Sequence, residues 1–223
     1  MGEARGRVSG AGERRVQIWI GLLLTLGVGL LPLGTWGSRL GVLGPVASTE
    51  TFWWVAVAVV LLYVRLVERR PLASVGFRKF GIVSLISGII TGILLVVGVV
   101  VIYGYVFPLL HLHMNIGEMG KLLATPFWYR FALVTRAAVA EELLFRGYPI
   151  ERLEELTSSR WVAALVSWAA FTYTHLSGWG APQLIVAGYG GALLTILYVW
   201  RRNLWVNMIA HWIGDAAGFL MPH

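Results

Sequence analysis

Six ionisable residues in the second half of the sequence have the types and spacing for acid–base chemistry. They are Glu141, Glu142, Arg146, His175, His211 and Asp215. The first three end an apolar stretch that begins near Phe127, and the others lie in two later apolar segments. Because a charged group is costly in an apolar helix, residues of this kind are typically kept for a function.

Helical spacing separates the two adjacent glutamates. Glu142 and Arg146 are four residues apart with the glutamate first, so they can pair along one helix face. Glu141 points about 100° away from that face and is left without this partner. The sequence therefore predicts one structural carboxylate and one free carboxylate. His211 and Asp215 are also four residues apart and share a face.

Each of these groups has a simpler interpretation as an interfacial residue or a helix-stabilising pair. Placing them together in one hydrated cavity would avoid the cost of burying each ionisable group separately, and we favour that arrangement. A glutamate with one histidine can take a proton from water, while a second histidine can stabilise an oxyanion. The pattern thus indicates a hydrolase without a covalent nucleophile.

Two other chemistries have weaker support. His175, His211 and a carboxylate could ligate zinc, but the helical His-Glu-x-x-His arrangement is absent. Ser167 and Ser177 flank His175 without the surroundings of a nucleophile elbow. The sequence has no cysteine, which excludes disulfides, thiolate metal sites and a cysteine nucleophile. We predict neither a metal nor another cofactor.

The composition predicts the elements that must position these residues. Of 223 residues 57% are hydrophobic and 13% charged, with a mean hydropathy of +0.73. Several apolar runs approach the roughly 20 residues that a membrane-spanning helix requires. We therefore predict a single all-α, polytopic membrane domain over residues 1–223, with a polar cytoplasmic segment at 1–15. The net charge of +7 comes from basic residues that cluster beside the apolar runs. This placement favours a role in membrane topology over nucleic-acid binding.

About seven spans are expected. They cover approximately residues 16–34, 52–67, 81–110, 126–146, 161–176, 182–200 and 204–220. The basic connections 65–79, 146–160 and 201–202 are predicted to be cytoplasmic, and 35–51, 108–125 and 177–181 to lie outside. This places the N-terminus inside and the C-terminus outside a prokaryotic plasma membrane. His111, His113, Glu118 and Lys121 are expected in a loop.

A shared site constrains the helices further. Glu141 reaches the depth of His175 only if the fourth helix continues past Pro149 to about Leu156, with the fifth helix tilted or starting below the membrane surface. Arg136 has two open roles, a structural ion pair or a place in the cavity wall. Glycines at 88, 92, 98 and 104 would allow a neighbouring helix to approach closely.

The ordered motifs resemble those of one family. They are Glu141-Glu142-x-x-x-Arg146, Phe171-x-x-x-His175, and Arg202-Asn203-Leu204-Trp205 leading to His211-x-x-x-Asp215. This set resembles the CPBP family of CAAX proteases and bacteriocin-processing membrane proteins, which includes the Ras-converting type of intramembrane glutamic endopeptidase. The resemblance covers roughly residues 127–218, the expected catalytic helices.

The resemblance implies a role for each matching residue. Glu141 would activate water with His175 as its partner, and His211 would bind the oxyanion. Glu142, Arg146 and Phe171 would support the site. Many members have asparagine where this chain has Asp215. Because an ionised aspartate cannot donate the hydrogen bond of an amide, we assign Asp215 to orienting His211.

The predicted function is thus hydrolysis of a peptide bond in a membrane-associated peptide or protein. The enzyme itself is predicted to lie in the lipid bilayer. One alternative is a non-catalytic scaffold or bacteriocin self-immunity protein that keeps the polar cluster for stability. Another is an ion transporter, although the spans show no paired halves. The motifs specify neither the substrate, nor prenyl recognition, nor the oligomeric state.

Overall fold

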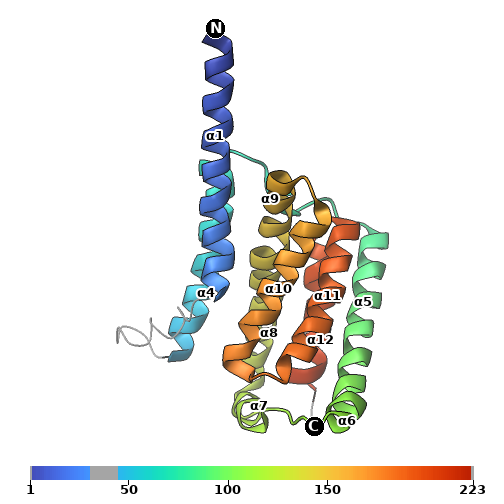
Figure 1. The fold of residues 1–223 in the computed structure, drawn as a ribbon. Helices are drawn as coiled ribbons and strands as arrows, with labels where there is room; N and C mark the ends of the chain where they lie inside the picture. The colour runs from blue at the N-terminus through green and yellow to red at the C-terminus, as the bar shows by residue number, and fades with distance from the viewer. Residues whose placement is uncertain (1, 31–44, 222–223) are drawn as a thin grey trace.

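The structure is a computed structural model that describes residues 2–30 and 45–221, and these residues form helices without any strand (Figure 1). The N-terminal helices are α1 (Gly2–Leu22), η1 (Leu23–Gly27), α2 (Val28–Leu30), α4 (Pro45–Leu62), η2 (Tyr63–Val67) and η3 (Leu72–Val75). The middle helices are α5 (Ile82–Val101), η4 (Ile102–Val106), α6 (Phe107–Leu109) and α7 (Ile116–Leu123). The last are α8 (Phe127–Glu142), η5 (Leu143–Gly147), α9 (Tyr148–Thr157), α10 (Arg160–Trp179), α11 (Gln183–Arg201) and α12 (Leu204–Phe219). The all-α prediction is confirmed.

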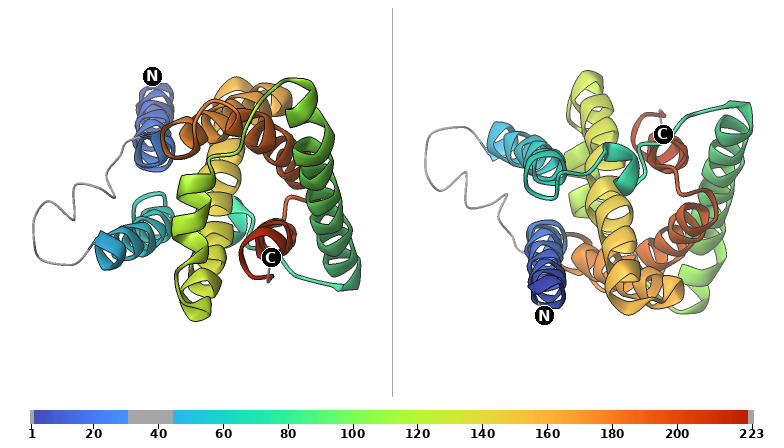
Figure 2. Two further views of the ribbon diagram at one scale, coloured as in Figure 1. Left: turned by 90° about the horizontal axis from the view of Figure 1, so that it is seen from below. Right: turned by 90° about the horizontal axis from the view of Figure 1, so that it is seen from above.

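The long helices form a bundle whose two ends differ. Helix α12 packs on α5 and α8, and α10 packs on α11 and α9 (Figure 2). Helices α1 and α4 lie along one side of this group. Helix α9 marks one end, and α7 with the C-terminus marks the other. We call these the α9 end and the α7 end.

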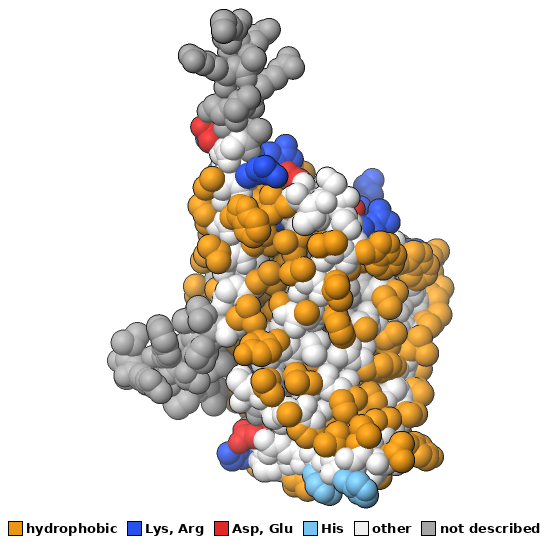
Figure 3. Space-filling view, viewed as in Figure 1, with side chains coloured by type: hydrophobic (Ala, Val, Ile, Leu, Met, Phe, Trp, Pro, Cys, Tyr) orange, Lys and Arg blue, Asp and Glu red, His pale blue; other side chains and the backbone are white. Residues whose placement is uncertain are grey.

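Three of the described helices are long and apolar enough to cross a membrane. They are Ala47–Val67, Ile82–Leu109 and Gln183–Arg201. Hydrophobic side chains cover the face between the two ends in Figure 3, as expected for a surface in contact with lipid. The protein is therefore an integral membrane protein, while the count of seven spans stays a prediction. Among the other helices proposed to span, α8 and α12 have 16 residues each.

Two connections differ from the sequence prediction. Helix α4 begins at Pro45, so the predicted connection 35–51 is helical from that residue, and its first part lies outside the described residues. Glu118 and Lys121 lie on helix α7 instead of in a loop, where they form an ion pair of 2.6 Å. Asn115 caps this helix, accepting a hydrogen bond from the backbone N–H of Glu118.

The predicted extension of the fourth helix is present. Helix α8 continues through the π-helical turn η5 into α9, which ends at Thr157. Pro149 lies in the first turn of α9 and has no backbone N–H, so it removes one hydrogen bond there. A π-helical turn directly before it accommodates this loss without breaking the helix, and such turns frequently occur at functional sites. Glu141 thereby lies well inside the bundle.

Glycines allow α5 and α12 to pack closely, as expected. A Cβ atom on Gly88 would come within 3.0 Å of the Val206 carbonyl oxygen. One on Gly92 would come within 2.7 Å of Ile213. Small residues are the usual means by which membrane helices approach one another. A Cβ atom on Gly104 would meet no described atom within 4 Å, so the expected close approach of a helix is not found there.

The α9 end is held together by ion pairs and a buried core. Arg152 donates to both carboxylate oxygens of Glu68, with Nε at 3.1 and 3.0 Å. The Tyr148 hydroxyl donates to the same carboxylate at 2.7 Å. Further pairs are Arg14–Glu155, Arg70–Glu155, Arg78–Glu151, Arg202–Glu151, Arg202–Glu154 and Arg160–Glu154. Beneath them lie fully buried side chains that include Val75, Tyr198 and Leu204.

Candidate active site

A cavity of about 380 Å³ lies inside the bundle, and the four residues with predicted catalytic roles all line it. They are Glu141 from α8, His175 from α10, and His211 and Asp215 from α12. Its volume is within the range of about 300–1,000 Å³ that is usual for ligand pockets. The remaining wall is mostly apolar. The fold therefore brings these four residues, far apart in the sequence, to one space.

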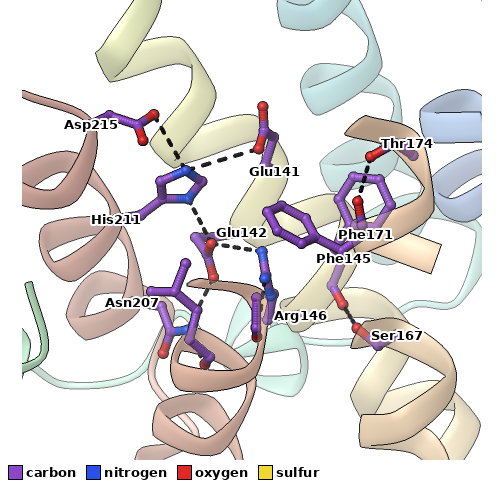
Figure 4. A network of polar contacts seen from close by, with 12 residues as sticks. Glu141, Glu142, Phe145, Arg146, Ser167, Phe171, Thr174, Asn207, His211 and Asp215 are labelled. Carbon is purple, nitrogen blue, oxygen red and sulfur yellow. Dashed lines mark hydrogen bonds and ion pairs between the residues drawn. The ribbon is translucent and has the colours of Figure 1, made fainter. Parts of the chain in front are cut away.

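Glu142 lies behind the cavity wall and is fully buried. Its Oε1 atom accepts hydrogen bonds from Arg146 Nη1 at 2.9 Å and from His211 Nδ1 at 2.7 Å. Its Oε2 atom accepts one from Asn207 Nδ2 at 3.0 Å (Figure 4). The predicted Glu142–Arg146 pair is thus present. Three donors from two helices around one carboxylate fix the relative positions of α8–η5 and α12.

Arg146 connects this carboxylate to the aromatic residue of the second motif. Its guanidinium carbon lies 3.9 Å from the centre of the Phe171 ring, a cation–π contact inside the protein. The Phe171 ring also lies 4.7 Å from the His175 ring and 6.4 Å from the His211 ring, measured between centres. Phe171 therefore packs between the buried ion pair and both histidines.

The contacts of His211 define which of its nitrogen atoms faces the cavity. Glu142 accepts from Arg146 and Asn207 as an ionised carboxylate, so His211 Nδ1 must carry the proton in their hydrogen bond. The other nitrogen, Nε2, lies 3.5 Å from Asp215 Oδ2 and 3.9 Å from Glu141 Oε2. In its protonated form, His211 presents an N–H donor between these two carboxylates.

His175 is held in a different way. Its Nδ1 atom lies 2.9 Å from the carbonyl oxygen of Phe171, one turn earlier on α10. Because a carbonyl oxygen only accepts, this contact places the proton on Nδ1 and leaves Nε2 as an acceptor. Glu141 and His175 share the cavity, but the described residues show no direct hydrogen bond between them. Glu141 lies nearer to His211.

Arg136 combines both roles that the sequence left open. Its Nε and Nη2 atoms each lie 3.3 Å from an oxygen of Glu50 on α4, forming a two-point ion pair. The guanidinium also lies 5.5 Å from the centre of the Trp53 ring. The same side chain lines the cavity. Arg136 thus attaches α4 to the wall of the site.

Sequence reasoning missed Asn207. Its side-chain NH₂ group donates to Glu142 and, at 2.7 Å, to the carbonyl oxygen of Leu194. Asn207 precedes His211 by four residues, so an Asn-x-x-x-His-x-x-x-Asp face on α12 was the available signal.

Ser167 is fully buried and donates to the Phe145 carbonyl oxygen, away from the cavity. Within the described segments, no group of three His, Asp or Glu side chains has an arrangement that could hold a metal ion.

Apolar helices around a buried carboxylate–imidazole cluster define a polytopic membrane protein with a polar site inside the bundle. Residues 123–217 match the family model described as "Type II CAAX prenyl endopeptidase Rce1-like". The matched segment includes all four catalytic candidates and the Glu142–Arg146 pair. This match supports the resemblance to the CPBP/CAAX protease family that the motifs of this segment indicate.

One curated relative is the "Uncharacterized protein YpbD" of Bacillus subtilis (strain 168). It is 38% identical over 79 residues, which is 35% of this chain. The aligned segment spans 38% of the length of that relative. No solved structure matches the chain.

Proposed function

We propose that the protein is a membrane-embedded peptidase in which Glu141 and His175 activate water and His211 stabilises the oxyanion. The observation that carries this proposal is the shared cavity of Glu141, His175, His211 and Asp215. The match of residues 123–217 to a family model described as a CAAX prenyl endopeptidase supports the reaction class. We propose a seven-span bundle with a cytoplasmic N-terminus as its setting.

In this mechanism a water molecule lies between Glu141 and His175. Glu141 takes one proton from it, while His175 Nε2 accepts the hydrogen bond of the other O–H group. The oxygen attacks the peptide carbonyl carbon, and the carbonyl oxygen becomes an oxyanion. When the carbon–nitrogen bond breaks, the proton on Glu141 passes to the departing amine. No covalent enzyme intermediate is formed.

His211 is suited to the oxyanion because its Nε2 atom, an N–H donor when the ring is protonated, faces the cavity. A donor held in place before the reaction stabilises the developing charge without reorganising. Its Nδ1 is fixed by Glu142, and Asp215 Oδ2 at 3.5 Å from Nε2 limits rotation of the ring. Asp215 is therefore a positioning residue in this proposal, and so are Glu142 and Arg146.

The test is cleavage by purified protein in proteoliposomes, using a panel of apolar peptides with and without a carboxy-terminal prenylated cysteine. We expect Glu141→Gln to lower the rate by about 10²–10⁴-fold, because it removes the base and keeps the shape. Glu118→Gln is the matched control, since Glu118 lies on α7 and pairs with exposed Lys121. A Glu141→Gln variant that keeps its cleavage rate would contradict the proposal. A wild type without cleavage, whose biological effect survives Glu141→Gln, would favour the scaffold or immunity function.

A further inference from the structure

The cavity extends toward only one end of the bundle. Its outer wall consists of Tyr103, Met119, Leu122, Trp179, Gln183 and Phe219. These residues lie in η4, in α7, at the end of α10, at the start of α11 and at the end of α12. All of these segments meet at the α7 end (Figure 1). No described residue of α9, η3 or the connection 65–79 lines the cavity.

Toward the α9 end the site is closed by packed side chains. Arg146, Phe145 and Tyr148 are at most 2% exposed and lie between the cavity and the α9 end. The buried Glu68–Arg152 ion pair lies next to them and accepts a hydrogen bond from the Tyr148 hydroxyl. A peptide approaching from the α9 end would therefore have to displace a buried core and break hydrogen-bonded ion pairs.

The charges of the two ends indicate their sides of the membrane. The α9 end carries many basic side chains, and those of Arg70, Arg78, Arg160 and Arg202 pair with glutamates of α9 itself. Figure 3 shows blue side chains gathered at this end. The basic side chains described at the α7 end are Lys121 and Arg130. Lysine and arginine in short connections favour the cytoplasmic side, so the α9 end is the cytoplasmic one.

We propose that the site is reached from the extracytoplasmic side of the membrane, and that its substrate is an apolar peptide segment exposed on that side. The identity of the substrate rests on the proposed peptidase function, whereas the direction of access does not. The mostly apolar wall suits hydrophobic side chains, and Glu141 and His211 lie deeper than the outer wall, where the peptide backbone would reach them.

The absence of native cysteine makes the side of access directly measurable. Three single substitutions are compared in sealed spheroplasts with a membrane-impermeant maleimide. Leu122→Cys reports on the cavity wall. Its neighbour Lys121→Cys reports on the surface of the α7 end, because the Lys121 side chain is 75% exposed. Thr157→Cys reports on the exposed surface of the α9 end.

We expect Leu122→Cys and Lys121→Cys to react in sealed spheroplasts, and Thr157→Cys to react only after permeabilisation. Reaction of Thr157→Cys from outside, or of Leu122→Cys only after permeabilisation, would overturn the proposal. Gln183→Cys gives a second cavity position. If neither cavity cysteine reacts even after permeabilisation, the cavity is not open to water and the proposal is likewise overturned.

A second measurement links access to cleavage. We expect a bulky maleimide on Leu122→Cys to lower cleavage of an externally added apolar peptide at least about tenfold, while the same label on Lys121→Cys leaves it unchanged. Equal cleavage by both labelled variants would contradict entry by this route. If labelling follows the prediction but the wild type cleaves no peptide, the peptidase function fails and the direction of access stands.

Discussion

The α9 end and the cavity both concentrate charged groups, but they pair them differently. At the α9 end, Glu68 accepts hydrogen bonds from Arg152 and Tyr148 and is 2% exposed. In the cavity, the nearest basic group to Glu141 is His211 Nε2 at 3.9 Å, beyond direct hydrogen-bond distance. Fully paired charges hold the fold together. A carboxylate left facing open space has the capacity to react.

The same difference separates two neighbouring residues of one helix. Glu142 is 0% exposed and satisfied by three donors, whereas Glu141 is 19% exposed at its side chain and faces the cavity. Substitutions in the two regions test whether this difference in pairing is a difference in role.

Glu142→Ala should have the largest effect on stability. It would leave Arg146 as an uncompensated buried cation and remove the acceptor of His211 Nδ1, at a cost of about 3–5 kcal/mol. Thermal unfolding in detergent would measure the loss. Glu141→Ala is the matched control, and we expect it to change stability by less than about 1 kcal/mol because water can reach the vacated space. Equal destabilisation by both variants would contradict the distinction.

Arg152→Met should destabilise the α9 end by about 3 kcal/mol, since Glu68 would stay buried without its partner. The double variant Glu68→Leu/Arg152→Met should recover most of that loss, because a buried pair can often be replaced by apolar side chains. We expect the double variant, measured per folded molecule, to keep the wild-type cleavage rate. A large fall in that rate would mean that the α9 end does more than hold the fold.

Gly191→Ala tests how tightly the aromatic residue of the site is held. A Cβ atom there would come within 2.8 Å of the Phe171 ring, so the ring that covers Arg146 must shift. We expect a loss of about 1–3 kcal/mol in stability, as for other overpacked positions. Gly188→Ala is the control, since its Cβ would make an ordinary contact of 3.7 Å with Thr172. Equal changes in the unfolding temperature of both variants would mean that the Phe171 ring is not tightly held.

Local spacing made much of the site predictable. The Glu142–Arg146 pair and the common face of His211 and Asp215 both follow from four-residue separations on one helix. The extension past Pro149 followed from the need to bring Glu141 to the depth of the histidines. These inferences use distances that a helix fixes by itself.

Contacts between helices were not predictable in this way. Arg136 meets Glu50 across 86 residues, and Asn207 meets Glu142 across 65. No helical period relates these positions, and only the packing of α4 on α8 and of α12 on α8 brings them together. Similarly, the hydrogen bond of His175 to its own helix backbone, in place of one to Glu141, depends on rotamer and surroundings.

The smallest expected effect concerns the surface of the α9 end. Arg70 donates two hydrogen bonds to Glu155, at 2.8 and 3.1 Å, and Arg14 lies at 2.6 Å. These contacts, that of Arg70 above all, lower the pKa of Glu155 to about 2 from an ordinary value of 4.5. Because the folded-state pKa is the lower one, the pairs stabilise the fold above about pH 4.5 and lose this contribution as the pH falls toward 2.

Glu155→Gln should therefore lower the unfolding temperature at pH 7 and have progressively less effect at lower pH. Solvent screens these partly exposed pairs, so we expect a difference of less than about 1 kcal/mol at pH 7. Thermal unfolding of wild type and variant in parallel at pH 7, 4.5 and 3 would measure it. A difference that grows on acidification would mean that Glu155 is not held ionised by its arginines. An unchanged cleavage rate at pH 7 is expected as well, because these ion pairs lie at the closed end of the bundle, remote from Glu141.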